Sequence, residues 1–267
     1  AFDFEDLQGF GPSRHGCLNC AHAPTLSKMT DTSFMRAALV QFASDLDVEA
    51  NTASITRLLA AIEPQSVDLV VLPEAAMCDF GPPSFDVNAV SQALDGPFVE
   101  FLGEQAQRLD SFVVAGIFER SAHGHPDRRF NTLVVVDPAG QLVAHYRKIH
   151  LFDSFGYRES DRFTSGPATP TVVSIAGEPW GLLTCYDVRF PELARTLVDQ
   201  GARGLILPAA WLAGPNKAFQ WETLVRARAI ENVCPVLAVG QPAPRYCGSS
   251  LAIDPLGATL AQAGTSE

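Results

Sequence analysis

The sequence predicts an α/β protein in which helices cover a mixed β-sheet. Short apolar runs alternate with longer segments of helical periodicity, which is the pattern of a sheet with helices packed on its faces. Two segments of turn composition, 137–140 (Asp-Pro-Ala-Gly) and 254–257 (Asp-Pro-Leu-Gly), each join two apolar runs and predict hairpins. Helical crossovers together with hairpins indicate that the sheet is mixed rather than purely parallel.

The predicted strands are apolar runs, most of them four to eight residues long and rich in β-branched side chains. In chain order they are 36–43, 67–72, 111–118, 132–136, 141–147, 171–175, 180–184, 204–208, 235–240 and 249–254. The predicted helices are 48–63, 88–109, 191–200 and 216–232. In the last of these, Glu222 and Arg226 are four residues apart, which places opposite charges on one helix face.

The domain organisation is simple, because no linker-like stretch divides residues 34–267, and we expect one domain there. Residues 1–33 are rich in Gly, Pro, Ser, His and Asp without periodicity, and we expect them to form a disordered extension. Met29 and Met35 precede the first strand, so the extension reflects either an upstream start or non-native sequence. The chain ends soon after its second hairpin, and we expect the C-terminus to be truncated.

Composition excludes several classes of partner. A chain of 267 residues with a net charge of −11 lacks the basic surface that binding to nucleic acid or to an anionic membrane requires. No apolar stretch approaches the roughly 18 residues of a membrane span, and the N-terminal region does not resemble a secretory signal. We therefore expect a cytoplasmic protein.

The six cysteines are too few and too scattered for a disulfide scaffold. Cys17 and Cys20 form a CxxC pair between His15 and His22, but no second pair completes a zinc or redox site. The sequence therefore predicts no metal site.

Three reactive side chains follow predicted strands. Glu74, Lys148 and Cys185 each stand at the carboxyl end of an apolar run. Ligands of open α/β sheets bind outside the carboxyl ends of the strands, so we expect the three side chains to converge there. Trp211 follows a fourth run and is expected to form a wall of the same pocket.

Cys185 lies where a buried strand turns toward a helix that opens with Pro191. A thiol facing a helix N-terminus is favoured as thiolate, and such a cysteine can act as a nucleophile. The alternative on position alone is that Cys185 is an ordinary buried core cysteine.

These residue types together suit acyl transfer. Glu74 would take the thiol proton if a dry site raised its pKa, and Lys148 would stabilise the anion that forms on the attacked carbonyl. The backbone N–H of Tyr186 would be a second donor to that oxyanion. Residue type leaves alternatives open: Glu74 and Lys148 as solvated loop charges, or His150 as the base in a Cys–His pair.

Three segments resemble the signature segments of the nitrilase superfamily of carbon–nitrogen hydrolases, in the family's order. They are 72–74 (Leu-Pro-Glu), 146–152 (Tyr-Arg-Lys-Ile-His-Leu-Phe) and 185–193 (Cys-Tyr-Asp-Val-Arg-Phe-Pro-Glu-Leu). The likeness runs from about residue 35 to the end of the chain, with further matches at 159–160, 166, 226–232 and 248–250.

This resemblance implies specific roles and a specific architecture. It implies Glu74 as the general base, Lys148 as the oxyanion support, Cys185 as the acylated nucleophile and Glu159 as a second acidic residue of the site. It also implies a four-layer αββα sandwich, assembly into a homodimer or larger homo-oligomer, and chemistry without a cofactor.

The residues after Cys185 resemble the amidase branch, which includes omega-amidase and deaminated-glutathione amidase, rather than nitrilases with Trp-Glu at that place. Arg189 suits a bidentate clamp for a substrate carboxylate. Its alternative role is to pair with Asp187 or Glu192 and brace the turn. Gln220 departs from the histidine of many relatives.

The predicted function is therefore hydrolysis of a small carboxylate-bearing amide through a Cys185 thioester, with release of ammonia. Within the family, the alternatives are an N-carbamoyl amidohydrolase and a nitrilase. From a different class, the alternative is a non-catalytic scaffold, which the intact set of Glu74, Lys148 and Cys185 disfavours.

Overall fold

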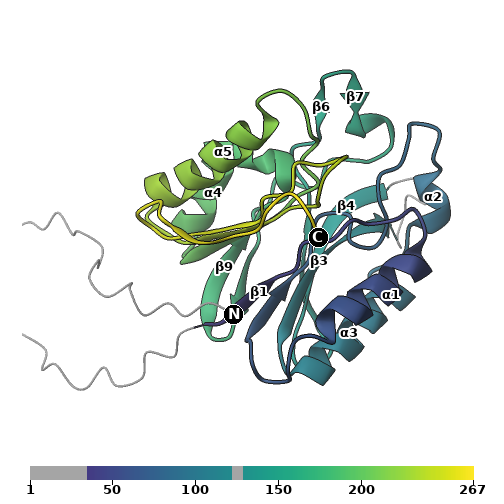
Figure 1. Cartoon of the computed structure of the whole chain (residues 1–267), viewed down its shortest axis with the longest axis horizontal. Helices are drawn as coiled ribbons and strands as arrows, with labels where there is room; N and C mark the ends of the chain where they lie inside the picture. The colour runs from purple at the N-terminus through teal and green to yellow at the C-terminus, as the bar shows by residue number, and fades with distance from the viewer. Residues whose placement is uncertain (1–34, 122–128) are drawn as a thin grey trace, which may run out of the picture.

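The computed structural model describes residues 35–121 and 129–267, and these form a four-layer sandwich. Two β-sheets lie face to face in the middle, with a pair of helices on each outer side (Figure 1). This is the αββα arrangement expected from the resemblance. The extension 1–33, with its Cys17–Cys20 pair, lies outside the described residues.

The first sheet has the strand order β1-β2-β3-β4-β5. The pairs β1–β2 and β2–β3 are parallel, whereas β3–β4 and β4–β5 are antiparallel, so the sheet is mixed as expected. The predicted turn at 137–140 joins its last two strands. The strands are Ala37–Leu39, Leu69–Val71, Phe112–Arg120, Arg129–Val136 and Leu142–Arg147.

The second sheet has the order β13-β12-β11-β10-β9-β8, with parallel pairing only among β9, β10 and β11. The predicted hairpin at 254–257 joins β12 to β13. The strands β8 to β13 are Val172–Ile175, Glu178–Leu182, Gly204–Pro208, Val236–Val239, Leu251–Ile253 and Thr259–Gln262. A separate hairpin, β6 (Asp153–Ser154) with β7 (Tyr157–Arg158), was not predicted.

The helices bury apolar faces against the sheets. α1 (Val48–Leu59) and α3 (Pro97–Leu109) cover the first sheet, and α4 (Pro191–Asp199) and α5 (Lys217–Asn232) cover the second (Figure 1). Between the sheets, side chains such as Leu133 in β4 and Ile206 in β10 belong to one fully buried cluster. This core holds the strand ends of the two sheets next to each other.

The helix predicted over 88–109 is wrong in extent. The structure has a short helix α2 at Val87–Val90 and then α3 from Pro97. Gly96 is the N-cap of α3 and Pro97 its first residue, and proline at this position starts a helix rather than continuing one. The apolar residues of α2 and α3 were assigned to a single helix, so the break between the two helices was missed.

Candidate active site

The turns after three strands bring the predicted residues together. Glu74 follows β2, Lys148 follows β5 at once, and Cys185 follows β9 from the other sheet. All three line one cavity. The convergence expected at the strand ends is therefore present, with contributions from both sheets.

Glu74 is held in place by donors on both of its oxygens. Oε1 accepts hydrogen bonds from Lys148 Nζ at 2.9 Å and Asn131 Nδ2 at 2.7 Å. Oε2 accepts one from the backbone N–H of Ala210 at 2.7 Å, and Ala210 follows β10 of the second sheet. Glu74 is 1% exposed, so it is not a solvated loop charge.

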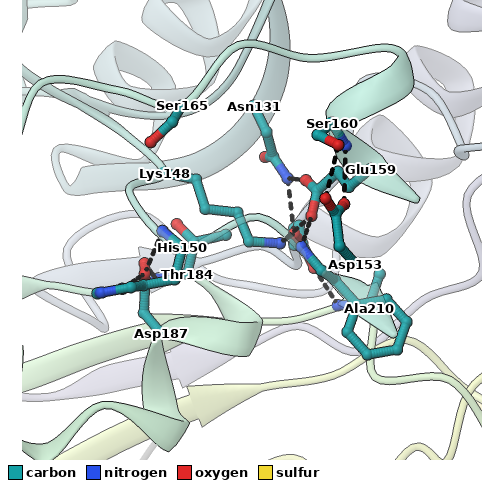
Figure 2. Close-up of polar contacts among 12 residues, drawn as sticks. Asn131, Lys148, His150, Asp153, Glu159, Ser160, Ser165, Thr184, Asp187 and Ala210 are labelled. Carbon is teal, nitrogen blue, oxygen red and sulfur yellow. Dashed lines mark hydrogen bonds and ion pairs between the residues drawn. The ribbon is translucent and has the colours of Figure 1, made fainter. Parts of the chain in front are cut away.

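Glu159 completes the cluster from the opposite side of the lysine. Its Oε2 accepts from Lys148 Nζ at 2.8 Å and from the Phe152 N–H at 2.7 Å, and its Oε1 accepts from Asn131 Nδ2 at 2.8 Å (Figure 2). Asn131 thus bridges the two glutamates. Sequence reasoning missed it, although a polar side chain at the start of an apolar strand was the available signal.

Lys148 is buried between two carboxylates. Burial alone opposes its charge, but Glu159 and Glu74 outweigh that cost, so the pKa of Lys148 is raised well above its usual value. The ammonium therefore stays charged at neutral pH and is oriented by two ion pairs. A fixed cation of this kind can stabilise a negative charge that develops beside it.

Cys185 stands at a strained position. It opens a 3₁₀ turn at Cys185–Arg189 with φ of 46°, in the left-handed region that residues other than glycine rarely adopt. Such a sharp turn after a strand exposes the side chain of a nucleophile. Cys185 lines the cavity although it is only 7% exposed.

The expectation that a helix N-terminus favours the Cys185 thiolate is wrong. The helix α4 begins only at Pro191, and burial, followed by the negative charge of Glu74, raises the pKa of Cys185 well above its usual value. A hydrogen bond with Glu74 contributes in the same direction. The resting thiol is neutral and needs a base to become nucleophilic.

A third buried carboxylate, Asp187, lies behind the turn. It accepts hydrogen bonds from the Tyr146 hydroxyl at 2.7 Å and the Thr184 N–H at 2.9 Å. His150 contacts it through both its backbone N–H, at 3.1 Å, and Nδ1, at 2.7 Å (Figure 2). The His150 ring also stacks on Phe190 with 3.6 Å between centroids and does not line the cavity. The rival Cys–His pair therefore has no support in the geometry.

The cavity itself is small, about 210 Å³, below the roughly 300–1,000 Å³ of pockets for drug-sized ligands. Its walls include the predicted residues Tyr186 and Trp211, and aromatic side chains that were not predicted, among them Phe80 and Phe152. Two unpredicted cations, Lys217 and Arg245, also line it. Nothing in the local sequence pattern distinguishes them from surface cations.

Arg189 is the one predicted site residue that does not line the cavity. Its Nη2 donates to Gln220 Oε1 at 2.6 Å, and its guanidinium carbon lies 4.8 Å from the centre of the Trp211 ring. Within the described part of the chain, Arg189 forms no ion pair with Asp187 or Glu192, so the alternative role of bracing the turn through these residues is not supported. The side chain is packed beside the cavity wall rather than exposed in the cavity.

Two further features concern metals and membranes. Within residues 35–121 and 129–267, no three His, Cys, Asp or Glu side chains gather as metal ligands. No helix in the same residues is long and apolar enough to span a bilayer.

Comparison with known proteins agrees with this geometry. The carbon-nitrogen hydrolase family model matches residues 36–267. A deaminated glutathione amidase of Escherichia coli O157:H7 is 38% identical over 230 residues, which cover 86% of each chain. A CN-hydrolase superfamily protein of Xanthomonas campestris, solved with an arsenic adduct in its active site, is 32% identical with a TM-score of 0.76 over 86% of each chain.

A Nesterenkonia amidase of the nitrilase superfamily is 26% identical, with a TM-score of 0.75 over 87% of each chain. In a variant of that amidase, acrylamide has added to the active-site cysteine. The family match spans nearly all of the described residues, and the fold is that of the solved members. The chain therefore belongs to the carbon–nitrogen hydrolase family and is an enzyme that hydrolyses C–N bonds other than peptide bonds.

Proposed function

We propose that the protein is an amidase that cleaves a small linear amide through a thioester on Cys185. The observation that carries this proposal is the position of the Glu74 carboxylate, which is held 2.9 Å from Lys148 Nζ and lines the same cavity as the thiol. A neutral thiol beside a fixed carboxylate and a fixed cation is the arrangement that acyl transfer needs.

In the first half-reaction, Glu74 takes the proton of Cys185 while the sulfur attacks the amide carbon. The carbonyl oxygen becomes an oxyanion, which Lys148 and the Tyr186 N–H stabilise. Glu74 then gives its proton to the departing nitrogen, the C–N bond breaks, and ammonia leaves. Glu159 positions Lys148 through their 2.8 Å contact.

In the second half-reaction, a water molecule takes the place of ammonia. Glu74 removes a proton from the water as it attacks the thioester carbon, and the C–S bond breaks. The carboxylic acid product forms and the thiol regains its proton from Glu74. The chain's own residues thus supply the base, the nucleophile and the charge stabilisation.

The substrate we propose is an amide that also bears a carboxylate. Two cations besides Lys148 line the cavity beside its aromatic side chains, and they would recognise an anionic group on a short chain. The similarity to deaminated glutathione amidases supports the same substrate class.

The test is a product assay on a panel of compounds. The panel contains succinamate, a 2-oxo omega-amide, deaminated glutathione, an N-carbamoyl amino acid, a neutral aliphatic amide and a nitrile. We expect turnover of carboxylate-bearing amides that disappears in Cys185→Ala. Turnover confined to the carbamoyl compound or to the nitrile would reject the substrate class, and activity retained by Cys185→Ala would reject the mechanism.

We also propose that the protein acts in the cytoplasm as a homo-oligomer. Its four described cysteines are all free thiols, which suits a reducing compartment. The outer helix α5 and a nearby turn expose apolar side chains, namely Phe219, Ile230, Val233 and Leu256. Analytical ultracentrifugation of the purified chain tests the oligomer, and a purely monomeric species would reject it.

A further inference from the structure

Lys217 is a nearly buried cation in the same cavity as Cys185. It is the first residue of α5 and is 9% exposed. Its Nζ lies 4.3 Å from the centre of the Phe155 ring, 5.1 Å from that of Phe152 and 5.2 Å from that of Trp211. Three aromatic rings thus surround an ammonium group that lines the cavity.

The three cations of the cavity differ in their partners. Lys148 pairs with Glu74 and Glu159, and Arg245 pairs with Asp79 at 2.9 Å. Lys217 forms no ion pair with any carboxylate among residues 35–121 and 129–267. The cavity therefore contains one cation whose charge the described residues leave uncompensated by an anion.

An ammonium in this position is electrostatically costly. Aromatic rings attract a cation, but each does so more weakly than a hydrogen-bonded carboxylate in a desolvated site. Burial first, and then the positive charge of Arg189, lowers the pKa of Lys217. An anion in the cavity would remove this penalty.

Arg189 strengthens the same positive region from outside the cavity. Its guanidinium lies against Trp211, the ring that also faces Lys217, while its Nη2 is occupied by Gln220. The amide-cleaving residues and Lys217 therefore share one cavity, whereas Arg189 has no direct access to it.

We propose that Lys217, rather than Arg189, binds the carboxylate of the substrate and so determines the preference for anionic amides. This inference rests on the proposed amidase function and specifies which residue recognises its substrate. The carboxylate pairs with the ammonium, the aromatic rings exclude water from the pair, and the amide end of the molecule reaches Cys185.

The experiment compares two amides of matched length, succinamate with a carboxylate and succinamide with a neutral carboxamide in its place. Lys217→Met keeps the aliphatic stem and removes the charge. We expect its kcat/KM for succinamate to fall by about 30-fold or more, mainly through KM, because one partner of a desolvated ion pair is lost. The value for succinamide should change by less than about 3-fold, since no ion pair is involved.

Two variants provide controls. Lys217→Arg restores a cation and should recover part of the preference for succinamate. Arg203→Met makes the same change of charge at a side chain that is 73% exposed, and it should leave both substrates unaffected. Equal rates of iodoacetamide labelling at Cys185 show that the site remains folded in each variant.

Binding without turnover separates this inference from the proposed function. Calorimetry of succinate with Cys185→Ala should show binding that the additional Lys217→Met change abolishes. Two results would overturn the role of Lys217 and leave the amidase mechanism intact. The first is an equal affinity for succinate with and without the Lys217→Met change. The second is an equal fall of kcat/KM for succinamate and succinamide in Lys217→Met. Selectivity lost in Arg189→Met but kept in Lys217→Met would assign the carboxylate to Arg189. Absence of amide turnover in the unaltered protein would reject the proposed function, whereas the succinate measurement still decides the role of Lys217.

Discussion

Glu74 and Asp187 are both buried carboxylates that flank Cys185, yet they are placed for different tasks. Both side chains are almost inaccessible, at 1% and 0% exposure, and each accepts several hydrogen bonds. Glu74 lines the cavity and shares a cation with Glu159, whereas Asp187 contacts Tyr146, Thr184 and His150 behind the turn. Access to the cavity, rather than burial or the number of hydrogen bonds, distinguishes the carboxylate that we propose as the base from Asp187.

The largest effect should come from Glu74→Gln. We expect kcat for amide hydrolysis to fall by about 10³-fold, because a positioned general base is lost from both half-reactions. Steady-state kinetics on succinamate measure this loss. Glu63→Gln makes the same change on the exposed surface and should have no effect. A loss below about 10-fold would mean that another group acts as the base.

Asp187→Asn should damage stability more than chemistry. The amide has one acceptor oxygen for four donors, so its NH₂ faces groups that also donate, and we expect the free energy of unfolding to fall by about 2–3 kcal/mol. Displacement of the Cys185 turn should lower kcat by about 10- to 100-fold. Urea unfolding and kinetics measure the two effects. Unchanged stability with a 10³-fold loss of kcat would place Asp187 in the chemistry.

The pH dependence of Cys185 alkylation should respond to the charge of Glu74 but not to that of Asp187. Burial and the charge of Glu74 both raise the pKa of Cys185, so Glu74→Gln should move the alkylation midpoint to lower pH, while burial keeps it above that of a free thiol. Asp187 is not among the causes of the shift, so Asp187→Asn should leave the midpoint near that of the unaltered protein. Iodoacetamide rates across pH test this, and a shift toward higher pH in Glu74→Gln would contradict it.

The smallest effect should come from His150→Gln. This change removes the contact of Nδ1 with Asp187 and the stacking on Phe190, and we expect a loss of about 1 kcal/mol in stability. We expect kcat to change by less than about 5-fold, since a catalytic base would contribute at least about 10²-fold. Thermal unfolding and initial rates measure the two effects. A loss of kcat of about 10²-fold with intact folding would support His150 as the base for Cys185.

The fold could be predicted from the sequence where the pattern of side chains repeats locally. Alternation of apolar runs with helical segments, together with the two Asp-Pro turns, indicated a mixed sheet and both hairpins. The sandwich of two sheets came only from the resemblance, because no local pattern specifies how two apolar sheet faces pack. The short hairpin of β6 and β7 carries little apolar periodicity and was missed.

The candidate site was predictable where a reactive residue follows a strand. Glu74, Lys148 and Cys185 met that condition, whereas Asn131 and the Ala210 amide contribute through pairings that only the folded chain creates. Lys217 resembles any cation at the start of an exposed helix until α5 is placed beside the cavity. The thiolate expected at Cys185 was wrong because burial, and then the charge of Glu74, raise the pKa of this thiol, and both arise only when the chain folds.

The hydrogen bond from Ala210 to Glu74 joins the two sheets at the site itself. Glu74 belongs to the strand ends of the first sheet and Ala210 to those of the second, so the orientation of the proposed base depends on how the sheets are aligned. We therefore expect the activity to depend on the packing of the two sheets against each other. Substitutions deep between the sheets, such as at Leu133 or Ile206, should change turnover without touching substrate, and heat inactivation should precede global melting if the sheets slide before they separate.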